Sequence, residues 1–386
     1  MCLCHFAPEQ LRKEKKTMRL KALDSLLFPA MKFIKAFDKR ESGLEYFDPE
    51  NVKSILVVSS TAIGDTLLST PAIRAVRESY PQSRITAHFN KKNMELFENN
   101  PDIDGIIPYC GGYRKFLKTI MEFRRHKFDL ALIFHGNEPQ ATPMAYLSGA
   151  MFIIKLPNTS EYRFLLSNKD RFQWEDFAHG VEQRLKVAEL AGCRISDKQM
   201  VLPVLKEGKS LEESFLRNHN IQDSDTIIGF QTGASTVSRM WFPDRFAELG
   251  KRLVDSSPKV KVVITGSPQE YAYCKKIADN IGQKAIVSAG KIPLKYLPSL
   301  VKRFKVLVTG DTGIMHMSIA VGTPVAALFA VADAKRSGPY YDMERHVVIQ
   351  KERTCDPCAS KKCRYQKCME NIGVDEVYSA VMKILK

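Results

Sequence analysis

The chain has 386 residues, 44% hydrophobic and 26% charged, and a formal net charge of +15 from 58 Lys and Arg against 43 Asp and Glu. This composition excludes an intrinsically disordered chain, and the length predicts two domains of roughly 150 to 200 residues each. The longest apolar runs are far shorter than the roughly 20 residues of a membrane-spanning helix, so we expect no such helix.

The excess of positive charge predicts attraction to a polyanion, such as nucleic acid, anionic lipid or a phosphorylated glycolipid. Nucleic acid ranks last, because the chain has neither a zinc-finger spacing nor an RNP-type aromatic strand. The N-terminal sequence lacks the apolar core of a secretory signal, which predicts a cytoplasmic chain. Nine cysteines, an odd number, then favour free thiols or a metal site over a disulfide framework.

Residues 1–48 form a basic leader with apolar side chains at helical spacing. The apolar residues are Leu20, Leu23, Leu26, Leu27, Met31, Ile34 and Phe37. Lysines and an arginine lie among them, so the helix can rest on an anionic membrane surface. The same pattern is typical of a helix packed on the body of a protein, and the sequence leaves both roles open.

Residues 49–205 alternate between apolar strands and amphipathic helices. We expect strands at 54–59, 84–89, 105–108, 130–134 and 151–155. Continuous apolar strands with helices between them predict a parallel sheet that is covered on both faces. The first domain is therefore expected to be α/β, doubly wound and Rossmann-like.

A polar stretch from Leu202 to Glu213 is expected to link this half to the next and to serve as a hinge. The second half, residues 206–350, repeats the α/β pattern, with expected strands at 226–231, 260–265, 285–288, 306–309 and 324–329. Residues 351–386 form a basic, cysteine-rich segment and an amphipathic helix, 374–385, which we expect to close across both domains. Two such domains bind a ligand between them, at the carboxyl ends of the strands.

The strongest local motif is Thr309-Gly-Asp-Thr-Gly-Ile-Met-His316, which follows an apolar strand and begins an apolar helix. Asp311 or Thr312 can cap this helix, and the free amides near Thr312 and Gly313 form an anion site with the helix dipole. A diphosphate fits there. A capped turn without a ligand would have the same sequence.

A second turn of this kind, Gln231-Thr-Gly-Ala-Ser235, follows the strand at 226–231. Thr232 and Ser235 offer hydroxyl groups, and Gly233 allows close approach of the backbone. Arg239 can bind phosphate oxygens in a bidentate manner, although a solvated arginine fits the sequence too. Two such turns in one half favour a phosphate-containing ligand.

In the first half, Ser59-Ser-Thr-Ala-Ile-Gly-Asp65 ends the opening strand. Gly64 is expected to give a tight turn and Asp65 to face the second domain, where a carboxylate can accept a hydroxyl proton as general base. Asp65 can equally be the N-cap of the next helix. Pro71 predicts a kink in that helix, or a helix that begins later with Thr70 as its cap.

Ser60, His135 and His179 are further polar residues on this side. Ser60 adjoins the turn before Asp65, and His135 follows the strand at 130–134. We expect Ser60, Gly64 and His135 on the acceptor side of the site. A structural role is the alternative for either histidine.

The run from Ile63 to Pro81, IGDTLLSTPAIRAVRESYP, resembles the opening signature of glycosyltransferase family 9. Further matches follow in order and approximate spacing, at 100–104, 179–185, 233–235 with 241–246, and 310–316 with 322–324. The resemblance covers about residues 52 to 385. Five motifs in sequence order are specific for this family, whose best-known members are bacterial lipopolysaccharide heptosyltransferases that use ADP-heptose.

The resemblance implies a GT-B fold and inverting, metal-independent transfer from a nucleotide sugar that the second half holds. Asp65 corresponds to the family's catalytic aspartate. Arg239 stands where the best-known members carry a lysine, so the charge is kept and the geometry differs. The implied donor-binding residues are Thr232, Gly233, Ser235, Arg239, Glu270, Asp311, Thr312, Gly313 and His316, with Glu270 near the ribose.

The resemblance also implies an anionic acceptor, the lipopolysaccharide core or a related glycan, and no cofactor. An enzyme with this acceptor is expected in the cytoplasm, peripheral to the cytoplasmic face of the inner membrane. A GT-B sugar-nucleotide epimerase and a non-catalytic glycan-binding protein are the alternatives on the same fold. An NAD dehydrogenase is disfavoured, because no G-x-G-x-x-G follows a strand.

Cys355, Cys358, Cys363 and Cys368 have the spacing C-x₂-C-x₄-C-x₄-C. This spacing suits a structural zinc or iron ion. The family's chemistry needs no metal, so free thiols packed in a loop are preferred to a bound metal.

Overall fold

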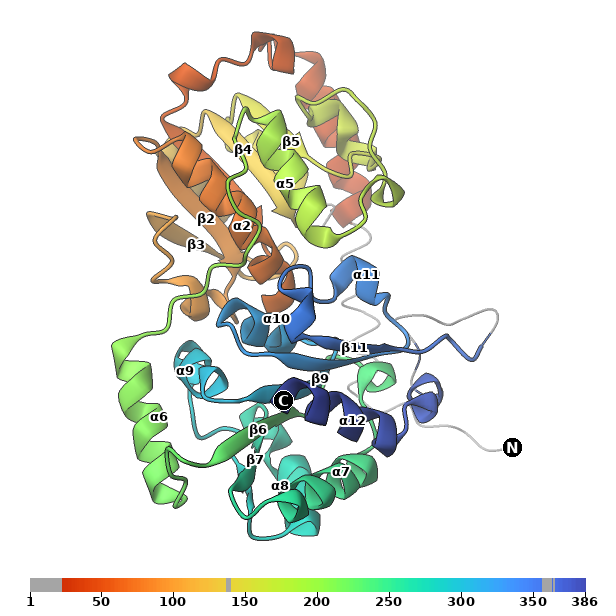
Figure 1. Ribbon diagram of the computed structural model, residues 1–386. Coiled ribbons are helices and arrows are strands. Elements are labelled where there is room, and N and C mark those ends of the chain that lie inside the picture. Colours follow the sequence, from red (N-terminus) through yellow and green to blue (C-terminus); the bar gives the residue numbers. More distant parts are fainter. Residues whose placement is uncertain (1–22, 137–139, 356–362, 364) are drawn as a thin grey trace, which may run out of the picture.

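The computed structural model describes residues 23–136, 140–355, 363 and 365–386. Two parallel β-sheets lie in separate lobes, and helices α2 and α10 lie where the lobes meet (Figure 1). The predicted α/β class with two Rossmann-like halves is confirmed. Each predicted strand agrees with an observed one to within one residue at either end.

The first sheet has the strand order β3-β2-β1-β4-β5, and all of its pairs are parallel. Its strands are β1 (Ser54–Ser59), β2 (Arg84–Asn90), β3 (Gly105–Tyr109), β4 (Leu130–His135) and β5 (Phe152–Lys155). Successive side chains of a strand point to opposite faces, so Val57 packs in one core cluster and Val58 in another. Both faces are covered, which is why these strands are continuous apolar runs in the sequence.

Helices cover the two faces of the first sheet. α2 (Ile63–Ser79) and α5 (Gly180–Leu190) pack on the Val57 face. The opposite face is covered by α3 (Phe116–His126), α4 (Ala141–Leu147) and a helix at residues 23–36, called the N-terminal helix below. Met31 anchors the N-terminal helix, because its side chain is only 1% exposed. The leader therefore packs on the protein body from residue 23 onward, and Leu20 lies outside the described residues.

Helix α2 contains Pro71 in its interior, so the alternative of a later start capped by Thr70 is wrong. The missing N–H of Pro71 leaves the carbonyl of Leu67 without its helical donor. The hydroxyl of Thr70 donates to this carbonyl at 2.7 Å and replaces the lost bond. Ala62 is the N-cap residue, so Asp65 lies in the first helical turn and its carboxylate is not the cap.

The second sheet has the order β11-β10-β9-β6-β7-β8, again with parallel pairs throughout. Its strands are β6 (Thr226–Gln231), β7 (Val260–Thr265), β8 (Ala285–Val287), β9 (Val306–Gly310), β10 (Val325–Phe329) and β11 (Val347–Gln350). The helices of this half are α6 (Lys206–Asn218), α7 (Pro243–Ser256), α8 (Tyr271–Ile281), α9 (Leu297–Lys302), α10 (Gly313–Ala320), α11 (Ala334–Ser337) and α12 (Val374–Leu385). The edge strand β11 was not predicted.

Two expectations about the connecting segments are wrong. The stretch expected to be a flexible linker becomes helix α6 from Lys206 onward, and the buried Glu212 forms an ion pair with Arg303 at 3.1 Å. The extended segment between the halves is therefore confined to the residues before α6, up to Leu205. Helix α12 does not cross the domains, because its buried residues Val377 and Val381 pack in a core cluster of the second sheet.

Within the described residues, no helix is both long and apolar enough to cross a bilayer. The domain boundaries at 48/49, 205/206 and 350/351 stay predictions. The boundary at 205/206 coincides with the first residue of α6, and the one at 350/351 with the end of β11.

Candidate active site between the two domains

Both sheets reverse their strand order at one point, between β1 and β4 in the first and between β6 and β9 in the second. Loops at such a point diverge and leave room for a ligand at the carboxyl ends of the strands. Asp65 and His135 follow β1 and β4, while Gly233 and Asp311 follow β6 and β9. The predicted site residues of each half therefore gather at the switch point of its sheet.

Asp65 lies in the first turn of α2 among polar partners. The hydroxyl of Thr61 donates to Asp65 Oδ2 at 2.8 Å. Asp65 Oδ1 lies 3.4 Å from Arg184 Nη2 and 3.6 Å from His135 Nε2. The side chain of Asp65 is 32% exposed, so a substrate hydroxyl can still reach the carboxylate.

These partners hold Asp65 in its ionised form. Burial by itself raises the pKa of this carboxyl, but the charges of His135 and Arg184 and the hydrogen bond from Thr61 lower it below its ordinary value overall. Burial lowers the pKa of Arg184 to about 10, so the guanidinium stays protonated near neutral pH. The site thus holds a carboxylate that is charged throughout the neutral range.

Thr61 joins Asp65 to the predicted acceptor-side residues. Its hydroxyl oxygen lies 2.7 Å from His135 Nδ1, and because its proton is donated to Asp65, the imidazole must donate from Nδ1. The backbone N–H of the buried Ser60 donates to the carbonyl of His135 at 2.9 Å. The loops after β1 and β4 are therefore tied together beside the carboxylate.

The first turns of α2 and α10 meet across the domain boundary. A Cβ atom on Gly64 would lie 2.7 Å from His316 Cδ2, and one on Gly313 would lie 2.9 Å from Ile63 Cβ. Gly64 was expected to provide a tight turn, but it is a helical residue whose missing side chain makes room for His316. Because these two glycines lack side chains, the first turn of α2, which carries Asp65, directly contacts the predicted phosphate loop at the start of α10.

His316 is buried at this contact and is electrically neutral. Burial lowers its pKa to about 4, and the neighbouring His179 lowers it further because two protonated rings would repel each other. Among the described residues, Nδ1 of His316 has no hydrogen-bond partner, although it is shielded from solvent. A neutral ring with an unused nitrogen at the domain boundary can serve a bound ligand.

The phosphate-type loop after β9 has the predicted cap. Thr312 is the N-cap of α10, and its hydroxyl accepts the backbone N–H of Met315 at 3.3 Å. Asp311 was the alternative cap, but its Oδ2 lies 3.1 Å from Arg239 Nη1 instead. The backbone of Arg239 also lies against Gly310, where a Cβ atom would come within 2.6 Å of the Arg239 carbonyl oxygen. The two predicted phosphate turns are thus in contact through Arg239.

The remaining donor-side residues follow β6 and β7. Thr232 is buried with its hydroxyl 3.7 Å from Cys274 Sγ, whereas Ser235 is exposed. The carboxylate of Glu270 lies directly against Gly233, whose lack of a side chain makes the approach feasible. Its Oε2 accepts the backbone N–H of Ser267 at 2.7 Å. The structure brings Gly233 and Glu270 together, and their role in donor binding stays a prediction.

His179 is a structural residue. It is the N-cap of α5, where its Nδ1 accepts the backbone N–H of Val181 at 3.1 Å. Its Nε2 lies 3.1 Å from the carbonyl oxygen of Gly338, and its ring stacks on Tyr340 with centroids 4.5 Å apart. Burial lowers the pKa of His179 to about 4, so it links the two halves as a neutral ring.

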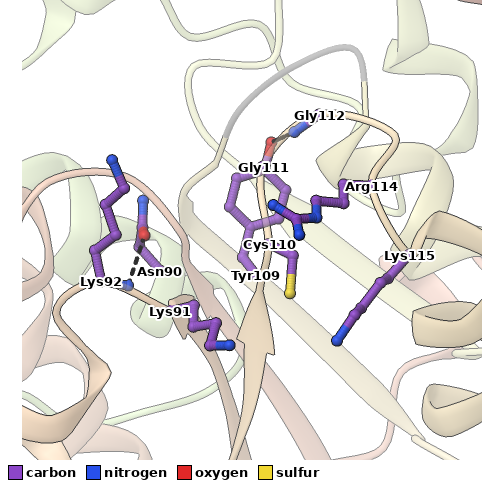
Figure 2. A pocket seen from close by; sticks show the side chains of 9 residues that line it. All are labelled: Asn90, Lys91, Lys92, Tyr109, Cys110, Gly111, Gly112, Arg114 and Lys115. Carbon is purple, nitrogen blue, oxygen red and sulfur yellow. Dashed lines mark hydrogen bonds between the residues drawn. The ribbon is translucent and has the colours of Figure 1, made fainter.

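A basic cavity of about 740 Å³ opens beside the loop that carries Ser60. Its lining consists of 90–92 at the end of β2 and of 109–112, Arg114 and Lys115 at the end of β3 and in the loop that follows, as Figure 2 shows. Its cationic residues are Lys91, Lys92, Arg114 and Lys115. Asn90, also in the lining, donates to the Ser60 carbonyl at 3.5 Å, so the cavity adjoins the Asp65 loop.

A smaller cavity of about 240 Å³ lies at the carboxyl ends of β4 and β5. His135, Lys155 and Trp174 are among its lining residues. Trp174 is 41% exposed, and an exposed indole offers a face on which a sugar ring can stack. His135 is shared by this cavity and the Asp65 network.

The cysteine segment is described only in part. Cys358 lies outside the described residues, whereas Cys355, Cys363 and Cys368 are described as free thiols. Among the residues that the structure describes, no three His, Cys, Asp or Glu side chains are grouped as metal ligands. Cys368 is buried and its sulfur lies 3.4 Å from the backbone nitrogen of Thr354.

Sequence reasoning missed three parts of the site. Thr61 and Arg184 were within quoted motifs but received no role, and the lysines and arginine of the basic cavity were not singled out. The sequence does carry a signal for the cavity, because Lys91-Lys92 and Arg114-Lys115 each follow the end of a predicted strand. Nothing in the sequence pairs Arg184 with Asp65, which lies 119 positions away.

Two Rossmann-like domains, with a carboxylate on one side of their contact and a capped helix N-terminus on the other, are the arrangement of the GT-B fold. Residues 117–369 match glycosyltransferase family 9 (heptosyltransferase). This match spans well over half of the chain. The chain therefore belongs to glycosyltransferase family 9 and is a glycosyltransferase.

Known proteins of similar sequence are heptosyltransferases. The chain is 23% identical over 309 residues to the lipopolysaccharide core heptosyltransferase OpsX of Haemophilus influenzae, with 78% of this chain and 86% of that protein covered. It is 26% identical over 298 residues to lipopolysaccharide heptosyltransferase 2 of Escherichia coli, with coverage of 71% and 82%.

Solved structures share the fold. A family 9 glycosyltransferase from Veillonella parvula superposes with a TM-score of 0.73 at 24% identity, over 86% of this chain and 97% of that one. The ADP-heptose lipopolysaccharide heptosyltransferase II of Escherichia coli gives a TM-score of 0.71 at 22% identity, over 86% and 98%. The GT-B architecture is thus established over nearly the whole described chain.

Proposed function

We propose that the chain is an inverting heptosyltransferase that moves heptose from ADP-heptose onto a lipopolysaccharide core or a related glycan. The names of the family relatives support the donor and the acceptor. One observation carries the mechanism: the ionised, partly exposed Asp65 stands next to the glycines at which the two domains touch. On the other side of that contact is the capped loop at Thr312.

In the proposed reaction, Asp65 acts as general base. The acceptor hydroxyl attacks the anomeric carbon, a new C–O bond forms, and the bond from that carbon to the phosphate oxygen breaks on the opposite face. The proton goes to Asp65, and the nucleoside diphosphate leaves with the electron pair. A carboxylate with a lowered pKa suits this role, because the hydroxyl becomes acidic only as its bond to carbon forms.

The second domain would stabilise the leaving diphosphate. Arg239 can contribute its guanidinium, and the backbone amides at Thr312 and Gly313 lie at the positive end of the α10 dipole. Asp311 orients Arg239 and lowers the net charge that the loop presents before the donor binds. Glu270 can accept hydrogen bonds from the ribose hydroxyls, because one of its oxygens remains beside Gly233.

The other donor-side residues would frame the nucleotide. Thr232 and Gly233 lie directly after β6, and the exposed Ser235 follows them in the same loop. His316 has an unused nitrogen close to Asp65, where the sugar would bind. No metal ion is needed, since the guanidinium and helix dipole can neutralise the diphosphate.

The first domain would hold the acceptor. Ser60, Gly64 and His135 border the carboxylate, and the basic cavity beyond Ser60 can bind phosphate or carboxylate groups of an anionic glycan. The acceptor sugar can stack on Trp174 in the smaller cavity. A hydroxyl between these two cavities would point at Asp65.

Donor entry requires the domains to separate. Gly313 now touches Ile63, so a diphosphate at the α10 amides needs the α2 and α10 termini to move apart. The extended segment before α6, up to Leu205, is the proposed hinge, because α6 is fixed to its own domain by the Glu212–Arg303 ion pair.

The test combines turnover with ligand binding. Asp65→Asn keeps the size of the side chain and removes the base, so ADP release from ADP-heptose with a lipopolysaccharide-core acceptor should fall at least about a hundredfold. Donor binding, measured as thermal stabilisation by ADP-heptose, should be unchanged. Asp223→Asn is the matched control, because Asp223 is exposed on the second domain, where it pairs with Arg303.

Three results would contradict the proposal. Full turnover by Asp65→Asn would exclude this residue as the base. Conversion of the sugar without an acceptor would identify an epimerase. Donor binding without ADP release, when the acceptor is supplied to the unmodified protein, would identify a non-catalytic binding protein.

A further inference from the structure

The N-terminal helix has two apolar stripes, and only one of them is covered. Leu27, Phe28 and Met31 pack on the first domain. A second stripe faces solvent with the spacing i, i+3, i+7 and i+10, consists of Leu23, Leu26, Ala30 and Phe33, and is continued by Phe37 directly after the helix. Phe33 and Phe37 are 68% and 71% exposed, and their rings contact each other. Apolar side chains that recur at helical spacing form one continuous apolar surface of the helix, unlike single apolar residues scattered over a protein surface.

Helix α3 exposes a similar face. Leu117 and Met121, one turn apart, are 73% and 58% exposed. Arg124 and Arg125 lie one turn further along, and Lys118 adjoins Leu117, so the exposed apolar pair is surrounded by cations. Apolar side chains among basic ones are typical of a helix that lies on an anionic bilayer surface.

Both helices belong to the same layer. Met31 of the N-terminal helix and Ile120 of α3 share the core cluster on the Val58 face of the first sheet. The start of the N-terminal helix is tied to the loop before α3, because Tyr113 donates to Asp24 at 2.6 Å. The solvent side of this layer therefore carries both exposed faces, which are called the docking face below.

The charge of the docking face is positive. The cationic residues of the two helices and of the segments next to them include Lys32, Lys39, Arg114, Lys115, Lys118, Arg124, Arg125 and Lys127. Three acidic residues of these segments are partnered: Asp24 accepts from Tyr113, Asp38 pairs with Arg40, and Glu122 lies 3.5 Å from Arg125. Each basic residue near an anionic membrane contributes about 1 kcal/mol of attraction, and clusters of roughly four to eight basic residues are typical of segments that bind anionic lipids.

The basic cavity adjoins the docking face directly. Arg114 and Lys115 line the cavity, and α3 begins at the next residue, Phe116. A glycolipid whose acyl chains remain in the bilayer could thus place its head group in the cavity without leaving the membrane. This last step rests on the proposed acceptor, whereas the docking itself does not.

We propose that the docking face binds the surface of an anionic lipid bilayer. Phe33, Phe37, Leu117 and Met121 insert among the head groups, and the surrounding lysines and arginines contact lipid phosphates. The orientation directs the basic cavity toward the bilayer. The second domain carries no part of this face, so it stays free to move as the donor enters.

The test is co-sedimentation of the full chain with vesicles. We expect binding to vesicles of phosphatidylcholine with phosphatidylglycerol, and much weaker binding to phosphatidylcholine alone. The double variant Leu117→Glu/Met121→Glu should reduce partitioning at least about tenfold, as should Phe33→Glu/Phe37→Glu. Leu211→Glu/Met343→Glu is the matched control, because these two side chains are 41% and 51% exposed on the second domain.

Added salt and Lys118→Gln/Arg125→Gln should also weaken binding to the anionic vesicles. Equal binding by the docking-face variants and the control would overturn the proposal. So would a dimer that these variants dissociate in the absence of lipid, since the face would then join two copies of the chain. Vesicle binding needs no turnover, so its failure is distinct from a failure of the proposed catalytic function.

Discussion

The guanidinium of Arg184 lies 3.4 Å from the carboxylate of Asp65, and the two residues come from neighbouring helices of the first domain. Arg184 is only 2% exposed, and it donates to the Gly180 carbonyl at 2.7 Å and to Ser69 Oγ at 3.0 Å. Ser69 in turn donates to the backbone carbonyl of Asp65 at 2.8 Å. A buried cation held this firmly fixes both the position and the charge of the carboxylate.

Replacing Arg184 should therefore change the pH dependence of transfer. In Arg184→Gln, the pKa of Asp65 rises because a positive charge that favours the carboxylate is lost. In the proposed mechanism activity requires the ionised form of Asp65, so the acidic limb of the kcat/KM profile is expected to move to higher pH. The profile of Arg184→Lys should stay close to that of the unmodified enzyme.

The pH profile of kcat/KM separates this effect of Arg184 on the charge of Asp65 from a simple loss of stability. Thermal unfolding of each Arg184 variant serves as the control, because removing a buried partner also destabilises the fold. If activity falls equally at every pH and the limb stays in place, Arg184 does not set the charge of Asp65.

Thr61 is the second partner of the carboxylate. Thr61→Val removes the 2.8 Å hydrogen bond to Asp65 and the 2.7 Å contact with His135 but keeps the shape of the side chain. We expect kcat to fall about tenfold with the donor KM unchanged, since one hydrogen bond to a charged group contributes roughly 1.5 to 3 kcal/mol. Thr61→Ser should restore most of the rate. A larger change in KM than in kcat would place Thr61 in donor binding instead.

Gly64→Ala should impair the approach of the domains. The new methyl group would lie 2.7 Å from His316 Cδ2, so the contact between α2 and α10 must open. Turnover should fall at least about tenfold, because a small misplacement of reacting groups has a large effect on rate. Small-angle scattering should report a larger radius of gyration.

Gly105→Ala is the matched control for that experiment, because a Cβ atom on Gly105 would meet no atom within 4 Å. Equal turnover by the two alanine variants would mean that the contact seen at Gly64 is not part of the catalytic arrangement.

The strands and their order of appearance could be predicted because they are apolar runs between helical patterns, as at β1 and β6. β11 was missed because it is an edge strand of only four residues, and Val347 and Val348 are half-buried. Helix α6 was mistaken for a linker because its charged surface hides an apolar side on which Phe215 and Leu216 are buried. The local pattern of apolar residues therefore predicts the strands of the two sheets, whereas the structure of edge and connecting segments such as β11 and α6 depends on tertiary contacts.

The site could be predicted where one loop carries the chemistry, as for Thr312 and its cap. The position of Asp65 near the second domain could be predicted, but its partner Arg184 could not, because only the packing of α5 on α2 brings the two together. The basic cavity was missed for the same reason, since its two loops follow different strands. Distance in sequence, rather than the type of residue, limited the prediction.

Stability should decrease as the pH falls from about 6.5 to about 4. Burial lowers the pKa of His88, His179 and His316 from 6.5 to about 4, so the folded state favours the neutral rings. Between these values the unfolded chain binds more protons than the folded one, and the contribution to stability, full above pH 6.5, is lost on acidification. His88→Gln should give a smaller decrease in melting temperature across this range, and an unchanged pH slope would contradict the assignment for His88.

Arg239 provides the most direct test of the donor side. It forms an ion pair with Asp311 of the capped loop at 3.1 Å, and its backbone lies against Gly310. Arg239→Ala should weaken binding of ADP and of ADP-heptose by about ten- to a hundredfold, because a charge-assisted hydrogen bond contributes roughly 1.5 to 3 kcal/mol. Arg239→Lys should lose less affinity, since it keeps the charge and loses the bidentate geometry.

Arg252→Ala is the control, because Arg252 pairs with the exposed Asp375 elsewhere on the same domain. Isothermal titration with ADP measures all three variants, and equal affinities for Arg239→Ala and Arg252→Ala would remove Arg239 from the donor site.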